Sequence, residues 1–365
     1  STIGSTINRD YSADPLAGGA PTKIRQLMVY PSTRHVVAFG CTDYGGTFRP
    51  TLVRWSSNQS PGSWARLDTD NKGDSGSVIL PDGSEILGAC ASKMEVLVWT
   101  DAALYKMAYE GDRFVFYGIS SSVSIMGPMA YTFAGDSIYW MGDRNFYVYN
   151  GSVEVVPCTV LEYVFGDPDA GLAYSQRKLI VAASNLRFNE VTFFYPSEGS
   201  TEVDRYVTYN YVDRVWTIGA MARTAWSDSS LRSKPQAALI NTDEPENSRL
   251  YEQEVGQNDV SSAMTAFVES AYFDIDEGDN FSFISRIIPD VRFLAGDGMT
   301  IEIKKKDFPN DVAETASTSS ITGGTLQESV RVRGRQVAVR FESDAKDVGW
   351  RLGDTRLDVR PDGRR

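Results

Sequence analysis

The sequence predicts an all-β protein, with β-propeller-like blades of about 41 residues followed by a small β-sandwich or strand-rich C-terminal region. Short runs rich in Val, Ile, Tyr, Phe and Trp alternate with clusters of Gly, Asp, Asn and Pro, which is the pattern of strands joined by turns. Apolar residues show no helical periodicity longer than about three turns. One aromatic hairpin pattern also recurs along the chain, as in proteins built from repeated blades.

The clearest repeat joins Met94–Gly111, MEVLVWTDAALYKMAYEG, to Asp136–Gly151, DSIYWMGDRNFYVYNG. In both, an apolar strand ends in Trp, a polar turn contains Asp, and a second strand starts with a large apolar residue followed by Tyr. Trp99 and Trp140 match at a separation of 41 residues, which makes the second turn one residue longer than the first. The other matched pairs are Asp101 with Asp143, Leu104 with Phe146, and Tyr105 with Tyr147.

Weaker copies extend this repeat in both directions. Trp55 lies 44 residues before Trp99, and Val181 lies 41 residues after Trp140. A further copy is predicted at Ile240. Because Trp and Tyr bury large areas, we expect the aromatic residues to pack between neighbouring blades. The predicted repeat core consists of Trp55, Trp99, Tyr105, Trp140, Tyr147, Tyr195 and Tyr251. A pair of β-sandwiches is the alternative architecture.

Three segments are predicted from changes in composition. Residues 1–23 are rich in Gly, Ser, Thr, Asp and Pro and are expected to form an N-terminal arm or linker without the apolar core of a secretory signal. Residues 24–275 form the propeller-like domain. Residues 276–365 form the C-terminal region of long alternating strands, in which Gly296–Gly298 is predicted to form a hairpin turn. A polar segment in this region, residues 309–324, is expected to be a mobile loop.

Arginines alternate with Val and Leu in the C-terminal stretches ESVRVRGRQVAVRFES and GWRLGDTRLDVRP. Because successive side chains of a strand point to opposite faces, the alternation predicts one face that carries arginines. Such a face is either solvated or an interface for acidic neighbours. Its predicted members are Arg331, Arg333, Arg335, Arg340, Arg351 and Arg356.

The chain is acidic: Asp and Glu number 48 and Lys and Arg 36, for a net charge of −12. This balance argues against nucleic-acid binding by charge neutralisation, which requires a basic surface. It is compatible with a pore through which DNA slides, because a negative lumen repels phosphate. The alternative is an acidic surface that simply keeps the protein soluble. No apolar run has the length of a membrane-spanning helix.

The sequence offers few groups for catalysis or metal binding. The single histidine, His35, lies at the start of an apolar run, and we expect no catalytic role for it. The three cysteines, Cys41, Cys90 and Cys158, have no zinc-binding spacing and are expected to be free, buried thiols. We predict no catalytic residue, no cofactor and no metal site.

Two motifs invite a chemical interpretation. Lys72–Ser77, KGDSGS, is similar to the nucleophile loop of trypsin-like proteases, but we favour a Gly-rich connection between blades. The stretch FDIDEGD, with Asp274, Asp276, Glu277 and Asp279, is rich in the oxygen ligands that calcium prefers. It lacks the twelve-residue loop pattern with a terminal Glu, so a solvated acidic turn is favoured.

Long stretches of the chain resemble the tail-tube or nozzle structural proteins of short-tailed bacteriophages. They are RHVVAFG, EVLVWTDAALYKM, IYWMGDRNFYVYNG, PCTVLEYVF, VDRYVTYNYVDRVWTIGAMARTAW, ESAYFDIDEGDNFSFISRIIPDV, and RGRQVAVRFES with GWRLGDTRLDVRPDGRR. The resemblance covers nearly the whole chain from about residue 25. It implies a virion protein that forms a ring, commonly sixfold, below the portal and adaptor, and that continues the DNA channel.

The same resemblance implies the protein's partners and location. The partners would be further copies of the chain, tail adaptor or portal-proximal proteins, tail fibres, and genomic DNA that passes through the lumen without sequence-specific binding. The protein would be assembled in the host cytoplasm, reside in the phage tail, help to retain and release DNA, and have no enzymatic activity. Ser200–Arg214 and residues 316–324 are the candidates for subunit contacts or a gate.

Two other functions stay open. A host-surface adhesin with a propeller fold would use exposed aromatic side chains to stack sugars. A propeller glycosidase would need carboxylates that converge near the central channel, with Asp101 and Asp143 as the residues to test.

Overall fold

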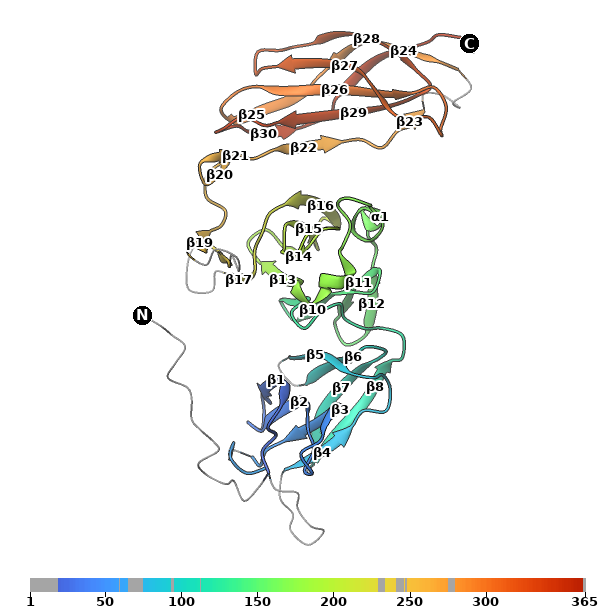
Figure 1. The fold of residues 1–365 in the computed structure, drawn as a ribbon. Helices are drawn as coiled ribbons and strands as arrows, with labels where there is room; N and C mark the ends of the chain where they lie inside the picture. The colour runs from blue at the N-terminus through green and yellow to red at the C-terminus, as the bar shows by residue number, and fades with distance from the viewer. Residues whose placement is uncertain are drawn as a thin grey trace. The chain divides into compact units, whose positions relative to one another are not determined.

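A computed structural model describes residues 19–58, 60–64, 75–92, 95–111, 113–228, 234–240, 246, 248–274 and 280–363. The chain divides into two compact units, Ser1–Gln253 and Glu254–Arg365 (Figure 1). Strands dominate both units. The prediction of an all-β fold, with propeller-like four-stranded sheets followed by a small β-sandwich, is confirmed.

The first unit is a series of antiparallel sheets, each formed by strands that are consecutive in sequence. The first sheet contains β1 (Ile24–Val29), β2 (Val36–Thr42), β3 (Phe48–Trp55) and β4 (Gly76–Ile79). The second contains β5 (Ile86–Ala91), β6 (Val96–Thr100), β7 (Leu104–Glu110) and β8 (Arg113–Ser120). The third contains β9 (Tyr131–Ala134), β10 (Ser137–Gly142), β11 (Asn145–Tyr149) and β12 (Val153–Val156). The fourth contains β13 (Val181–Asn185), β14 (Glu190–Tyr195), β15 (Arg205–Asn210) and β16 (Val215–Ala220), and the fifth contains β17 (Ala225–Ser227), β18 (Gln236–Leu239) and β19 (Arg249–Glu252).

Successive sheets pack face to face, because apolar side chains occupy both faces of the central sheets. On β6, Val98 joins the core shared with the first sheet, whereas Trp99 joins the core shared with the third. On β14, Phe193 belongs to the core shared with the third sheet, whereas Phe194 packs against Trp226 of the fifth. Covering each sheet by its neighbours in this way is how propeller blades bury their two faces.

The first strands of neighbouring sheets lie side by side, β1 by β5, β9 by β13, and β13 by β17. The Gln26 side chain joins β1 to β5. Its amide nitrogen donates to the Ala89 carbonyl oxygen at 2.6 Å, and its amide oxygen accepts from the Ala89 N–H at 2.8 Å. Gln26 therefore gives the edge of β5 the donor and the acceptor that a further strand would supply.

The two strongest repeats differ in register from the prediction by one residue. Both hairpins have two-residue turns, Asp101–Ala102 and Asp143–Arg144, so the second turn is not longer than the first. The residue opposite the matched tyrosine is Val98 in the second sheet and Trp140 in the third. In register, Trp140 thus corresponds to Val98 and not to Trp99, and the two sheets repeat at 42 residues.

Because of this offset, Trp99 points from the second sheet toward the third, and Trp140 points from the third sheet toward the second. The two side chains meet between the sheets. The rings of Trp99 and Trp140 pack edge to face with their centroids 5.4 Å apart, and both side chains are fully buried. Trp140 also stacks on Tyr147 and donates its indole N–H to the Ser124 carbonyl oxygen at 3.2 Å. The aromatic contact therefore joins the second sheet to the third.

The remaining repeat residues do not occupy equivalent strands of their sheets. Trp55 is on the third strand of its sheet, and Tyr195 is on the second strand of its own. The period is lost before the fourth sheet, because helix α1 (Leu161–Phe165) and a 3-10 turn (Tyr174–Leu179) are inserted there. Tyr251, on β19, is half-buried. The buried members of the repeat core are Trp55, Trp99, Tyr105, Trp140, Tyr147 and Tyr195.

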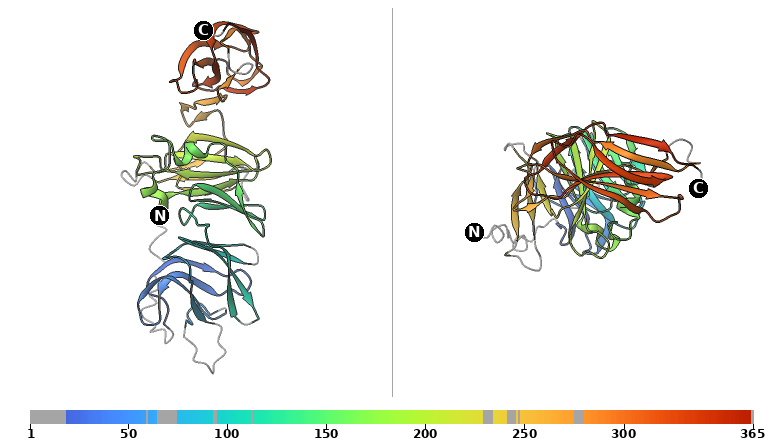
Figure 2. Two further views of the ribbon diagram at one scale, coloured as in Figure 1. Left: turned by 90° about the vertical axis from the view of Figure 1, so that its right-hand side faces the viewer. Right: turned by 90° about the horizontal axis from the view of Figure 1, so that it is seen from above.

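The second unit is a two-layer β-sandwich (Figure 2). One layer contains β22 (Ala266–Glu269), β29 (Gln336–Ser343), β26 (Met299–Lys306) and β27 (Glu314–Ile321), with β23 (Phe273–Asp274) also paired to β29. The other contains β28 (Glu328–Gly334), β24 (Ser282–Ile288) and β31 (Arg356–Pro361), together with β25 (Val291–Ala295) paired to β30 (Gly349–Leu352). A short hairpin, β20 (Asn258–Asp259) and β21 (Ser262–Ala263), precedes them. Apolar side chains from both layers form one core.

The second unit differs from the prediction in three places. Gly296–Gly298 joins strands of different layers and does not form a hairpin, because β25 pairs with β30 whereas β26 pairs with β27 and β29. It begins at Glu254, ahead of the boundary predicted at residue 276, because β22 and β23 pair with β29. The segment expected to be a mobile loop contains β27, which pairs along β26. Ala316 and Ile321 of β27 pack on the core, so a strand rich in Ser and Thr is held by its few apolar residues.

Replacing Trp140 with alanine is expected to destabilise the first unit by about 3–5 kcal/mol, since it removes a fully buried indole from the contact between two sheets. Chemical denaturation followed by circular dichroism measures the loss. Tyr117→Ala is the control, because the Tyr117 side chain is exposed, and it should cost less than about 1 kcal/mol. A Trp140→Ala loss as small as that of the control would contradict this packing.

Replacing Gln26 with leucine is expected to cost about 1–3 kcal/mol, because it leaves the Ala89 N–H and carbonyl of β5 without their partner. The same denaturation experiment measures it. Amide hydrogen exchange at Ala89 should also become faster. Unchanged exchange would show that the Gln26 side chain does not act as the missing strand.

Candidate functional site

Four of the six arginines predicted at an interface lie on the outer face of one sandwich layer. Arg331 and Arg333 lie on β28, Arg351 on β30, and Arg356 on β31. Their neighbours along these strands point into the sandwich core, namely Val330, Val332, Leu352 and Leu357. Since strand side chains alternate, the four arginines point outward.

The strands β24–β25 and β30–β31 form one long antiparallel ribbon with a single break. Pairing runs from Ser282 opposite Pro361 to Ala295 opposite Gly349. At the break, the Gly353 N–H donates to the Asp290 carbonyl oxygen at 2.7 Å. The ribbon therefore presents one continuous outer face, and its inner residues pack on the same core.

Three further arginines lie on this outer face, Arg286, Arg292 and Arg360, and the sequence interpretation missed them. The alternation in SRIIPDVRFLAG and TRLDVRP carries the signal that would have found them. We name the full set the arginine face. Its members are Arg286, Arg292, Arg331, Arg333, Arg351, Arg356 and Arg360.

Two members of the arginine face are paired with carboxylates. Arg286 forms an ion pair with Asp358, and the Arg333 Nε lies 2.6 Å from a carboxylate oxygen of Asp362. Among the residues that the structure describes, no carboxylate lies within ion-pair distance of the other five. The face thus carries excess positive charge on a chain whose net charge is −12, and its chemistry suits acidic groups.

The other two predicted arginines belong elsewhere. Arg340 lies on β29, in the opposite layer, where its Nη1 is 3.0 Å from Glu269 and its guanidinium lies over the Phe267 ring. Arg335 follows β28 at the turn, over the rings of Phe281 and Phe308. Alternation predicts the face of each strand but not the layer to which the strand belongs, so these two do not join the arginine face.

The Glu269 carboxylate stands between two cations. Partial burial favours the neutral acid, but hydrogen bonds from Lys304, at 2.8 and 2.9 Å, and from Arg340 outweigh it and lower the Glu269 pKa. This network joins β22, β26 and β29. Arg340 is therefore bound by two carboxylates of the sandwich, those of Glu269 and Glu342, and has a structural role there.

In the first unit, the histidine and the cysteines hold structural positions. His35 is fully buried and its Nδ1 lies 2.5 Å from the Thr33 hydroxyl. Cys41 and Cys90 are buried and Cys158 is half-buried, and all three are free. Burial raises the pKa of Cys41 and of Cys158 to about 11 and raises that of Cys90 as well, which disfavours the reactive thiolate.

The motifs with a chemical interpretation are placed only in part. The Asp101 carboxylate accepts hydrogen bonds from the Ser84 N–H at 2.6 Å and from the Ser84 hydroxyl at 2.5 Å. It therefore links the turn between β6 and β7 to the segment that precedes β5. Of KGDSGS, Lys72–Asp74 lie outside the described residues, and Gly76 begins β4. Asp276, Glu277 and Asp279 of the acidic stretch also lie outside the described part of the chain.

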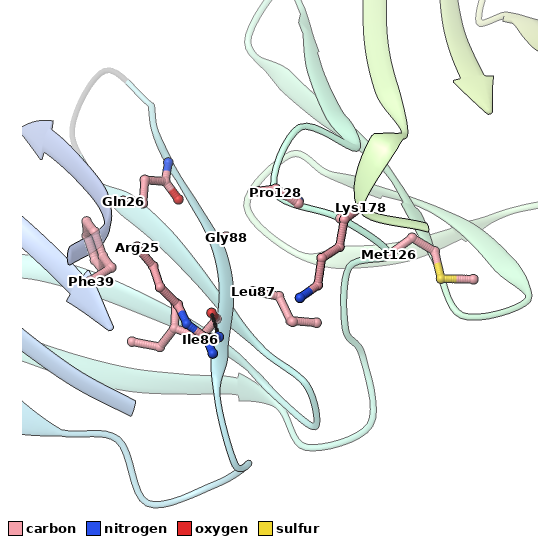
Figure 3. Close-up of a pocket in the computed structure, with 10 residues that line it drawn as sticks. Arg25, Gln26, Phe39, Ile86, Leu87, Gly88, Met126, Pro128 and Lys178 are labelled. Atoms are coloured by element: carbon pink, nitrogen blue, oxygen red, sulfur yellow. Dashed lines mark hydrogen bonds between the residues drawn. The ribbon is translucent and has the colours of Figure 1, made fainter. Parts of the chain in front are cut away.

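A cavity of about 240 Å³ lies in the first unit beside β1 and β5 (Figure 3). Its lining is mainly apolar, with Phe39, Ile86, Leu87, Met126 and Pro128. The Arg25 guanidinium donates to the Ile86 carbonyl oxygen at 3.2 Å and is also paired with Glu85. Figure 3 shows the Lys178 amine pointing toward Leu87 from the other side. Arg25 thus serves to tie β1 to β5.

Neither a metal centre nor a membrane helix is present in the described residues. They contain no group of three or more His, Cys, Asp or Glu side chains placed to hold a metal ion. No helix among them is both long enough and apolar enough to span a bilayer.

No protein-family model and no curated protein matches the chain. Solved structures that are similar include a putative 6-phosphogluconolactonase from Bacteroides uniformis, at 9% identity and a TM-score of 0.32, covering 62% of this chain and 80% of that one. A family 43 arabinoxylan arabinofuranohydrolase from Bacillus subtilis has 9% identity and a TM-score of 0.28, with 95% and 98% covered. A fructofuranosidase from Schwanniomyces occidentalis has 8% identity and a TM-score of 0.25, with 84% and 91% covered.

These three structures carry the names of enzymes, one of them putative, so the prediction that the chain has no enzymatic activity is not upheld. That prediction is corrected accordingly. With TM-scores between 0.25 and 0.32, the similarity assigns no reaction and no substrate to this chain.

Acid is expected to destabilise the second unit through Glu269. The folded-state pKa of this carboxyl lies below its usual value of 4.5, so its contribution to stability is present above that pH and is lost as the pH falls through the folded-state pKa. Glu269→Gln should lower the melting temperature at pH 6 and flatten its decline between pH 6 and pH 3. Asp344→Asn is the control, because Asp344 is an exposed carboxylate of the same unit. Equal slopes for wild type and Glu269→Gln would refute the assignment.

Proposed function

We propose that the chain is a structural subunit of the tail tube or nozzle of a short-tailed bacteriophage, and that it assembles into a ring around the path of the genomic DNA. The resemblance of its long sequence stretches to such proteins supports the proposal. The structural observation that carries it is the arginine face on a chain with a net charge of −12.

A closed ring requires two different surfaces that fit each other, because each subunit contacts its neighbours head to tail. The arginine face and the acidic remainder of the chain meet this requirement by charge. Electrostatic complementarity of this kind selects the partner and its orientation. Further copies of the chain are the first partners in this proposal, followed by tail adaptor or portal-proximal proteins and tail fibres.

The acidic balance also suits a channel for DNA. A negative lumen repels phosphate and lets the duplex slide, whereas a basic lumen would hold it. The propeller-like stack of sheets supplies a rigid body for such a channel, because each sheet is covered on its apolar faces by the next. In this proposal the protein retains and releases DNA as part of the virion.

Electron microscopy of the purified protein at micromolar concentration and low salt is the direct experiment. We expect ring-shaped particles with a central channel, with the sixfold symmetry that the resemblance implies. The matched sample at high salt should contain fewer rings, because salt screens contacts between exposed charges. Single-copy particles under every condition would contradict the proposal.

A further inference from the structure

Two arginines face each other directly across the ribbon of the second unit. Arg292 on β25 and Arg351 on β30 are opposite residues in an antiparallel pair, and both side chains are exposed. Opposite residues of such a pair have Cβ atoms about 4.5–5.5 Å apart, and like charges at these positions are destabilising. The fold thus places two arginine side chains opposite each other, at a cost in stability.

The flanking residues fix the orientation of this pair. Val291 and Phe293 on one strand, and Trp350 and Leu352 on the other, pack on the sandwich core. The two guanidinium groups are therefore held on the same outward side of a strand pair that is anchored from below. A planar guanidinium binds a carboxylate through two parallel hydrogen bonds, so two adjacent ones form a receptor for carboxylate groups.

The nearby carboxylates do not neutralise the pair. Asp290, at the break in the ribbon, accepts from the Asp354 N–H at 3.2 Å through its carboxylate. Within the described residues, neither Arg292 nor Arg351 has a carboxylate within ion-pair distance. Arg356 and Arg360 follow along the same outer face and also have no such partner in residues 280–363. The positive charge of this line of side chains is available to another molecule.

We propose that the Arg292–Arg351 pair is the centre of a carboxylate-binding contact and that its occupant is the acidic surface of a second copy of this chain. The inference rests on the proposed ring and names the surface that closes it. Charge complementarity selects the occupant: the chain carries 48 Asp and Glu residues against 36 Lys and Arg residues, so a neighbouring copy has an excess of carboxylates. Nucleic acid is disfavoured, because the same excess of carboxylates repels phosphate.

Charge reversal tests the contact. The variant Arg292→Glu with Arg351→Glu should weaken self-association at least tenfold in sedimentation velocity at low salt. The matched control, Arg187→Glu with Lys346→Glu, changes the net charge equally at two exposed positions off the arginine face and should change association less than threefold. Circular dichroism checks that both variants fold. Equal association of the two variants would overturn the proposal.

A charge-preserving variant identifies the occupant. Arg351→Lys introduces an amine that a carbodiimide can join to a carboxylate in direct contact. In a mixture of isotopically light and heavy protein, we expect mixed cross-links between the introduced amine and an Asp or Glu of another copy, located by mass spectrometry. Cross-links that form only within one copy, or none, would overturn the proposal.

The two experiments separate this contact from the proposed function. If the wild type forms rings but charge reversal and cross-linking show no effect at the arginine pair, the contact is wrong and the ring stands. If the wild type does not self-associate at all, both fail. Binding of a DNA duplex to the wild type, abolished by the Arg292→Glu and Arg351→Glu changes, would replace the second copy by nucleic acid and also overturn the proposal.

Discussion

Alternation of side chains along antiparallel strands is the constraint on which both units depend. In the first unit the central sheets are apolar on both faces, so each must be covered on both sides by another sheet. Face-to-face packing of consecutive sheets follows from this requirement. The contact of Trp99 with Trp140 is its clearest instance, because each ring extends from a different sheet into the same interface.

The second unit uses the same alternation with only one apolar face for each layer. Its inner residues fill the sandwich core, which leaves the outer face free to carry charge. On one layer that face carries seven arginines, two of which are paired with the carboxylates of Asp358 and Asp362. The residues that pack in the core and the charged residues at the surface are thus separated by strand face, and a change on the arginine face need not disturb the packing beneath it.

The arginines of the second unit differ in whether they are paired with carboxylates, and the unpaired ones give the arginine face its positive charge. Arg340 is held between Glu269 and Glu342 inside the network of β22, β26 and β29, so its charge is already satisfied. Arg292 and Arg351 face each other instead, with no described carboxylate beside them. Arginines in opposite layers of one small domain therefore differ in whether a carboxylate of the same chain neutralises their charge.

The sequence by itself determined the fold class, the hairpin repeat of the second and third sheets, and the outward direction of the arginines on β28, β30 and β31, because these depend on local periodicity and turn composition. It missed β27, whose Ser- and Thr-rich strand is held by pairing with β26. Only the tertiary structure decided that Trp140 corresponds to Val98, that α1 interrupts the period, and that Arg340 lies in the opposite layer. Strand register and layer membership depend on pairing between residues distant in sequence, and a single chain's local pattern does not encode that pairing.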